Sequence, residues 1–345
     1  MKDDKNKTIV FRTPRGTEEL FQHEAILHKY AVRKLEDLYI KNRYFPVQTP
    51  VFDFFDIYAP LMDQSMISKT YRMVDREGEV LMLRSDITLF IAKQLGTSLT
   101  KKDLPVRISY ADTILRHEGQ EDISRDEFFQ AGIELIGIKE RNADIEILNL
   151  LYDSIKIFKT PFFAIHLGSK KVFDLIFSQI DMSTKKQIKT AILLRNKRAL
   201  RELLSIGGYT EEEIANIENL VMFVGDSDLF ESLLTSLKLD KSIMEECKSL
   251  LKTVKQSNIP KENIKIDMSE IGINDYYSGI AFRVYMDGAD SEVASGGRYD
   301  NLLRYFGLDC PAIGFSIMLR KIESLMQEKE KLLPEGINKT LKESI

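Results

Sequence analysis

The segment 127–137 constrains the fold more than any other part of the sequence, because apolar and polar residues alternate along it. In an extended strand alternate side chains share a face, so Gln130, Gly132 and Glu134 lie on one side. The opposite side carries only apolar residues: Phe129, Ala131, Ile133 and Leu135. The alternation therefore predicts a strand with one face in a hydrophobic core.

The polar face of this strand suggests a ligand site. Gly132 has no side chain, so a ligand has room to lie on the backbone between Gln130 and Glu134. Glu134 would meet a cationic group, and Gln130 would donate and accept hydrogen bonds. An ordinary half-solvated strand explains the same alternation, and spacing alone favours that alternative.

Hydrophobic periodicity divides the chain into an α+β core and a helical insert. Up to about residue 163, strand-like runs alternate with amphipathic helices, and strand-like runs return at 264–268, 280–285 and 292–294. Between these regions apolar residues recur at helical intervals. We expect a core of residues 1–168 and 259–326, a helical insertion domain of residues 169–258, and a charged tail of residues 327–345. Helices are expected at 301–306 and across 315–326.

Several short motifs follow one another along the chain, at 13–17, 44–50, 83–88, 116–118, 127–137, 274–279 and 294–300. The segment 83–88 contains Asp86 and Thr88, and 116–118 begins with Arg116. Tyr276 and Tyr277 would point to opposite faces if extended, so one of them enters a shared pocket. Counting from Gly279 favours Tyr277.

In this order, the motifs resemble those of histidyl-tRNA synthetases, which are class II aminoacyl-tRNA synthetases. The resemblance covers nearly the whole chain and implies an antiparallel sheet flanked by helices, with a helical insertion lobe. It also implies a dimer interface at 44–50 and a binding site for histidine, without a metal or a cofactor. The residues that match this site are Asp86, Thr88, Arg116, Gln130, Glu134, Tyr276 and Tyr277.

Departures from the synthetase pattern remove positive charge. Adenylate formation needs fixed cations around the ATP phosphates. The positions where the resemblance implies arginine hold other residues: Ser124, Asp126, Gly272 and Lys321. Asp86 replaces an expected Glu and Met318 an expected Gly. We therefore expect no amino-acid activation unless Arg125 or Arg320 compensates.

The whole pattern is most similar to the regulatory-subunit family of ATP phosphoribosyltransferase, which is paralogous to the synthetase catalytic domain. The resemblance implies a noncatalytic subunit that activates the short catalytic subunit in the first step of histidine biosynthesis. It further implies feedback sensing of free histidine and a homodimer within a hetero-oligomer. One alternative is a divergent ligase that adenylates an amino acid for another acceptor. Another is a scaffold whose histidine pocket has decayed.

Composition narrows the remaining classes. The 345 residues include 49 Lys plus Arg and 53 Asp plus Glu, so no basic excess favours tRNA or another polyanion. Residues 327–345 are too few for an anticodon-binding domain. The chain has no apolar run long enough to span a membrane, and its charged first residues lack the pattern of a secretory signal. Its two cysteines are far apart, which is typical of a cytoplasmic protein.

The four histidines contribute little to the prediction of the functional site. His23 and His28 lie on a charged helical segment, which predicts that both are solvated, and His166 is interpreted as structural. The sequence leaves open whether His117 lines the pocket beside Arg116. The Gly296–Gly297–Arg298 run lacks the spacing of a phosphate-binding loop, and it predicts a close approach between a strand and a helix.

Overall fold

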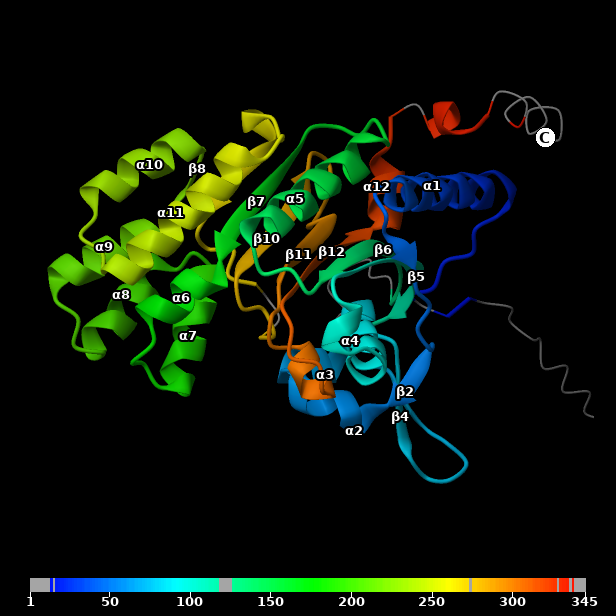
Figure 1. The fold of residues 1–345 in the computed structure, drawn as a ribbon, viewed down its shortest axis with the longest axis horizontal. Coiled ribbons are helices and arrows are strands. Elements are labelled where there is room, and N and C mark those ends of the chain that lie inside the picture. The colour runs from blue at the N-terminus through cyan, green and yellow to red at the C-terminus, as the bar shows by residue number, and fades with distance from the viewer. Residues whose placement is uncertain are drawn as a thin grey trace, which may run out of the picture.

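The computed structural model describes residues 13–14, 16–117, 126–272, 275–327, 329–334 and 337. Within these residues, one nine-stranded sheet forms the centre of the molecule, in the order β1–β5–β6–β12–β11–β10–β7–β9–β8 (Figure 1). In that order, the bounds are Phe45–Pro46, Val106–Leu115, Glu127–Ile136, Ala312–Met318, Ala294–Arg298, Ile280–Met286, Phe163–Ser169, Ile264–Asp267 and Val224–Gly225.

The middle of the sheet is antiparallel, as the resemblance implied. Parallel pairs occur near its two ends, where β1 lies beside β5 and β7 beside β9. Strand β6 pairs along its whole length with β5, and it pairs with β12 on its other side. Its alternation therefore places Glu134 and Gln130 on one face of the sheet, and Ile133 and Leu135 on the other.

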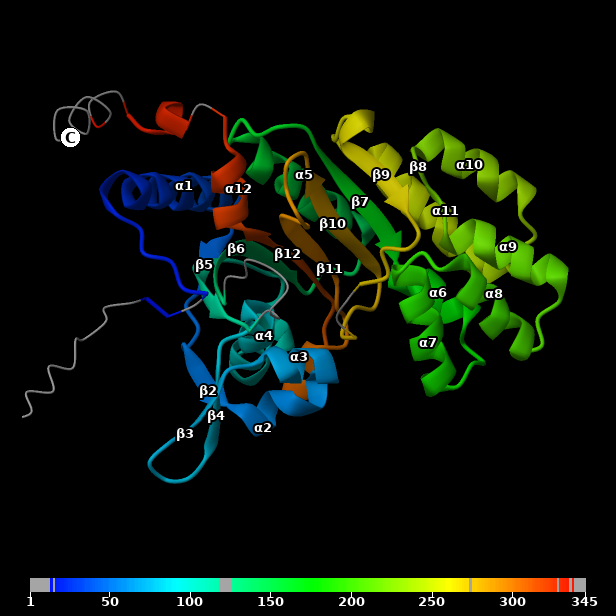
Figure 2. The same cartoon turned by 180° about the vertical axis from the view of Figure 1, so that it is seen from behind.

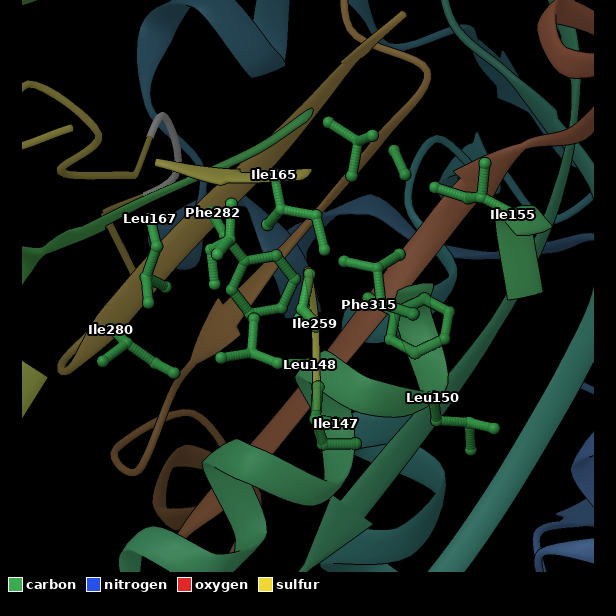
Figure 3. Close-up of a cluster of buried hydrophobic side chains, with 14 of the residues drawn as sticks. Ile147, Leu148, Leu150, Ile155, Ile165, Leu167, Ile259, Ile280, Phe282 and Phe315 are labelled. Carbon is green, nitrogen blue, oxygen red and sulfur yellow. The ribbon is translucent and has the colours of Figure 1, made fainter. Parts of the chain in front are cut away.

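The main hydrophobic core lies between the sheet and the helices that cover one face. Helix α5 (Arg141–Lys156) runs across this face, and α1 (Gln22–Lys41) packs beside it near β5 and β6 (Figure 1). Ile147 and Leu148 of α5 meet Phe282 of β10 and Phe315 of β12 in this core (Figure 3). Burying such side chains contributes about 1.5–3 kcal/mol each, so this face anchors the sheet.

The opposite face is covered only in part (Figure 2). Helix α4 (Ile87–Ser98) packs there against β5 and β6, in a second core that includes Leu89, Phe90, Ile108 and Tyr110. A small antiparallel sheet lies next to α4 and consists of β2 (Phe52–Phe54), β4 (Val80–Leu83) and β3 (Arg72–Val74). Short helices connect this region: α2 (Phe55–Tyr58), η1 (Ala59–Leu61), α3 (Gln64–Lys69) and η2 (Lys101–Asp103).

Arg84 joins the small sheet to the large one. Its side chain is fully buried, and its guanidinium donates to the carbonyl oxygens of Thr113, on β5, and Thr49. Asp112 supplies the counter-charge, with its carboxylate 2.7 Å from Nη2. The arginine of the 83–88 motif is therefore a structural residue, because its donors are used inside the protein.

The insert predicted for 169–258 contains six helices and the short strand β8 (Figure 1). They are α6 (Lys170–Ile176), α7 (Met182–Leu193), α8 (Lys197–Ile206), α9 (Glu211–Val221), α10 (Ser227–Ser236) and α11 (Lys241–Gln256). The buried residues of α7 and α8 belong to a separate small core. Those of α10 and α11, such as Phe230 and Leu250, join the main core. The insert is thus independent of the sheet only in its outer half.

Three local expectations were wrong. The segment 315–326 is not one helix, because β12 continues to Met318 and α12 (Leu319–Leu325) begins afterwards. The segment 301–306 holds only a 3-10 turn, η4 (Leu303–Phe306). Strand β11 begins at Ala294, and Gly296 approaches the neighbouring strand β12, with Gly314 O only 2.3 Å from the position of an added Cβ. That approach is between two strands and not between a strand and a helix.

The carboxyl-terminal segment also differs from a charged tail at its start. After η3 (Lys261–Asn263) and α12, a last 3-10 turn, η5 (Lys329–Leu332), lies beside α1, and Leu333 is buried. Leu332 also packs against the main core, so packed apolar residues continue past residue 326. None of the helices in the described part of the chain is long and apolar enough to cross a membrane.

Candidate functional site

A cavity of about 670 Å³ lies on the face of the sheet opposite α5. Strands β6, β10, β11 and β12 form its floor, and residues from α3, α4 and the 275–279 segment form part of its wall. The structure brings together all the residues predicted for the site, since each one lines this cavity: Asp86, Thr88, Arg116, Gln130, Glu134, Tyr276 and Tyr277.

Glu134 lies at the bottom of the cavity and is 1 % exposed. Thr88 Oγ1 donates a hydrogen bond to Oε1 at 2.8 Å, and the Tyr299 hydroxyl donates to Oε2. Both donors are neutral, so neither compensates the carboxylate charge. Burial therefore raises the pKa of Glu134 to about 8, and the nearby Asp86 contributes to the rise.

Gly314 makes the position of Glu134 possible. It is opposite Glu134 in the register of β12 and β6, and a Cβ added to it would lie 1.6 Å from Glu134 Oε2. The carboxylate therefore occupies the space that any larger residue at position 314 would fill. Gly314 thus contributes to the site through its missing side chain.

Asp86 caps α4 and also lines the cavity. Its Oδ1 accepts the backbone N–H of Leu89 at 3.1 Å, and its Oδ2 accepts the Tyr276 hydroxyl at 3.3 Å. Burial raises the pKa of Asp86, while the Arg116 charge works in the opposite direction. The buried carboxyl of Glu134 and the half-buried carboxyl of Asp86 therefore lie in one cavity, a setting that favours a bound cation.

Gln130 and Gly132 behave differently from the expectation. The Gln130 amide nitrogen lies 3.8 Å from the sulfur of Met318, which fills space beside it. A Cβ added to Gly132 would meet the Tyr110 hydroxyl at 2.6 Å and the Phe315 carbonyl oxygen at 2.2 Å. The gap predicted above Gly132 is thus occupied by Tyr110, and Gly132 does not line the cavity.

Both tyrosines of the 274–279 motif line the cavity, whereas the sequence favoured Tyr277 alone. Their ring centroids are 5.0 Å apart, and the Tyr276 ring also makes an edge contact with Tyr299. Residues 275–279 form a turn and not a strand, so the rule of opposite faces does not apply. Tyr299 also lines the cavity and was not predicted for the site, although it belongs to the 294–300 motif. Tyr110 was not predicted either, because only the β5–β6 pairing places it beside Gly132.

The two cations at the start of α12, Arg320 and Lys321, are held by acidic and hydroxyl groups of the chain itself. Arg320 pairs with both oxygens of Glu18, at 3.0 and 2.7 Å, and it also contacts Glu323. Lys321 donates to Ser291 and lies 3.6 Å from Asp290. Both side chains line the cavity, but their charges are already partnered.

Two positions where arginine was expected do not favour phosphate binding. One has no room for an arginine side chain, and the other holds an acid, which repels phosphate. Gly272 has a φ of 77°, and a Cβ added there would lie 2.5 Å from the Tyr277 ring, so this backbone excludes an arginine. Asp126 is an acid and accepts the Tyr71 hydroxyl at 2.6 Å. Ser124 and Arg125 lie outside the described residues.

The histidines are structural or peripheral. His117 does not line the cavity, and its Nδ1 lies 3.4 Å from Asp126. The expectation that His28 is solvated was wrong, because its side chain is 14 % exposed and contacts Glu323 at 2.8 Å. His166 contacts the buried Asp267 at 3.0 Å, as expected for a structural residue.

The model of the family described as histidyl-tRNA synthetase matches residues 16–322. The chain belongs to this family. A relative from Clostridium kluyveri, named ATP phosphoribosyltransferase regulatory subunit, is 29% identical over 310 residues, which are 88% of this chain and 79% of the relative.

Two solved structures share the fold. One is described as an ATP phosphoribosyltransferase regulatory subunit/histidyl-tRNA synthetase from Bacillus halodurans C, with a TM-score of 0.78, 22% identity, and coverage of 92% of this chain and 84% of that one. The other is from the ATP phosphoribosyl transferase (HisG:HisZ) complex of Thermotoga maritima, with a TM-score of 0.63, 18% identity, and coverage of 85% and 97%.

The buried carboxyl of Glu134 should make stability depend on pH. Its pKa is about 8 in the folded chain against an ordinary 4.5, so the folded state binds more protons between these values. The free energy of unfolding should therefore fall as pH rises from about 4.5 to 8, by up to about 1.4 kcal/mol per pH unit. Glu134→Gln removes this component, and urea unfolding between these pH values measures it.

The exposed Glu262→Gln is the matched control and should keep the wild-type pH dependence. A constant difference in unfolding free energy between wild type and Glu134→Gln at every pH would contradict the raised pKa.

Proposed function

We propose that this chain is a noncatalytic regulatory subunit of ATP phosphoribosyltransferase that senses free histidine. The observation that carries this proposal is a contrast within one cavity. The acidic end keeps groups suited to an amino acid, whereas the cations near the other end are paired internally. The names of the relative from Clostridium kluyveri and of both solved structures support the same role.

The proposed ligand of the acidic end is histidine. Glu134 is buried and Asp86 is half-buried, and the hydrogen bonds described above for them come from neutral groups. Arg116 is the cation that acts on Asp86, and an ammonium or an imidazolium group would stabilise the ionised form of Glu134. The rings of Tyr276 and Tyr277 provide apolar faces near these carboxylates. Aromatic faces also attract cations, which adds to the preference for this ligand class.

A ligase remains the alternative, and the charges of the site argue against it. A triphosphate needs several free cations, but Arg320 is already paired with Glu18 and Glu323. Releasing it would leave two carboxylates beside the phosphates. At an effective dielectric of about 20, such a repulsion is on the order of 4 kcal/mol at contact distance. Asp126 adds a further acid at a position where the resemblance implied an arginine.

We also propose a homodimer, which would cover an exposed apolar surface. This surface follows β1 and the small sheet, where Phe45 is 61% exposed, Phe52 50% and Val74 67%. Further exposed apolar residues in the same elements or beside them are Val51, Phe54, Met73 and Val80. Exposed apolar residues that gather in neighbouring elements are typical of an interaction site. It includes the 44–50 segment, where the resemblance implied a dimer interface.

The isolated chain is expected to be a dimer without ligase activity. Sedimentation velocity should give twice the monomer mass, and Phe52→Asp should shift the mass toward the monomer. Amino-acid-dependent exchange between pyrophosphate and ATP should not exceed the background of a reaction without protein, for any of the twenty amino acids. Exchange above that background would establish the ligase alternative, and a monomeric wild type would refute the dimer.

Histidine binding should depend on Glu134 and change its protonation. At pH 7 the carboxyl is largely protonated, because burial raises its pKa to about 8, and a bound cation would favour the ionised form. Calorimetry in two buffers of different ionisation enthalpy should show proton release if the ammonium group lies at Glu134, and no net release if the imidazole ring takes up the proton. Glu134→Gln should bind roughly 10- to 150-fold more weakly, which corresponds to a lost charge-assisted hydrogen bond of about 1.5–3 kcal/mol. Unchanged affinity would move the histidine site elsewhere.

The partner should be the short catalytic subunit, which would supply the substrate chemistry in the cytoplasm. Mixing the two proteins should form a hetero-oligomer with faster phosphoribosyl transfer to ATP than the catalytic subunit alone. Histidine should inhibit this complex, and Glu134→Ala should raise the inhibitory concentration about 5- to 150-fold, the range of a typical coupling free energy. If the variant complex stays as histidine-sensitive as wild type, feedback acts through another site.

A further inference from the structure

A row of polar side chains crosses the cavity floor beside Glu134. Arg283 of β10 is opposite Ser295 of β11, and Ser295 is opposite Ser316 of β12. All three line the cavity. Because residues in register on neighbouring strands point to the same face, their side chains form one line across three strands. Ser295 belongs to the 294–300 motif, but the sequence analysis did not predict it as a site residue, nor did it predict Arg283 or Ser316.

The row lies one step along the strands from the carboxylate of Glu134. Glu134 Oε2 occupies the space above Gly314, and Ser316 is two residues further along the same strand. Two residues of an extended strand cover roughly 6.6–6.8 Å. A histidine molecule with its ring at Glu134 can span this gap with its carboxylate.

The groups in the row can donate more hydrogen bonds than they make within the described residues. Within the described residues, the hydroxyls of Ser295 and Ser316 make no hydrogen bond, and both residues are half-buried. Arg283 lies 3.0 Å from Glu270 through Nε and donates to the Tyr285 hydroxyl through Nη1. A guanidinium has five N–H donors, so these two partners do not exhaust it. Glu270 balances the arginine charge but supplies no donor.

We propose that Ser295, Ser316 and Arg283 form an oxyanion subsite in the cavity. The oxyanion is either the carboxylate of the amino acid whose cationic group lies at Glu134 or a separate phosphate. The carboxylate form rests on the proposed histidine binding, whereas the phosphate form does not. With a carboxylate in the subsite, the cavity binds both the cationic group and the carboxylate of a free amino acid.

The experiment compares L-histidine with L-histidinol, which has a hydroxymethyl group in place of the carboxylate. Calorimetry is performed on wild type, on Ser295→Ala/Ser316→Ala and on Ser324→Ala. Ser324 also lines the cavity, but its hydroxyl donates to the Lys321 carbonyl oxygen at 2.7 Å, so it is the matched control. Wild type and the control should prefer histidine, and the double variant should lose about tenfold of that preference. An equal urea midpoint shows that the double variant is folded.

A second arm tests phosphate. If phosphate is the occupant, inorganic phosphate should raise the thermal midpoint of wild type and Ser324→Ala but not of the double variant, while the preference for histidine over histidinol stays unchanged. If wild type binds no histidine, the proposed sensing function fails, and the phosphate arm alone decides the subsite. An unchanged preference for histidine together with no effect of phosphate would overturn the subsite and leave histidine sensing intact.

Discussion

The carboxylate of Glu134 is the group on which the rest of the site depends. Strand register places it above Gly314, and hydroxyls from α4 and from the end of β11 hold its two oxygens. These neutral donors fix its position but supply no positive charge, so burial keeps the carboxyl largely protonated at pH 7, and a bound cation would stabilise its ionised form. The folded state tolerates the free-energy cost of burying this carboxyl, because the opposite face of the same sheet packs against the main core.

The two ends of the cavity differ in how their charged side chains are held. The acidic end is shaped by the sheet itself, so it persists as long as the strands pair. The basic side chains near the other end are held by groups from other parts of the chain: Arg320 is paired with Glu18, which is 302 residues away from it. The charge available at that end therefore depends on a few acidic residues and not on the sheet.

The sequence predicted those parts of the site that follow from local periodicity. The alternation in 127–137 identified the cavity face of β6, and every residue that the resemblance suggested for a histidine site lines the cavity, although the binding of histidine there stays a prediction. It failed where distant chains meet. Tyr110 fills the space above Gly132 because β5 pairs with β6, and no spacing within either strand reveals that register.

The wrong helix at 315–326 has a related cause. Strand β12 is buried on its core face and carries small or apolar residues on the other, so its run of hydrophobic residues has no strict alternation. A short apolar run fits a buried strand and a helix equally well. Only the pairing of β12 with both β6 and β11 decides between them.

The divided packing of the helical insert has a mechanical consequence. Helices α10 and α11 share the main core and are thus part of the same cooperative unit as the sheet, whereas α7 and α8 are stabilised by their own small core. Segments with separate cores open at separate free energies. We therefore expect the outer pair to open at a lower free energy than α10 and α11 while the sheet stays folded, and its contact between Lys189 of α7 and Asp275 would transmit such opening to the wall of the cavity.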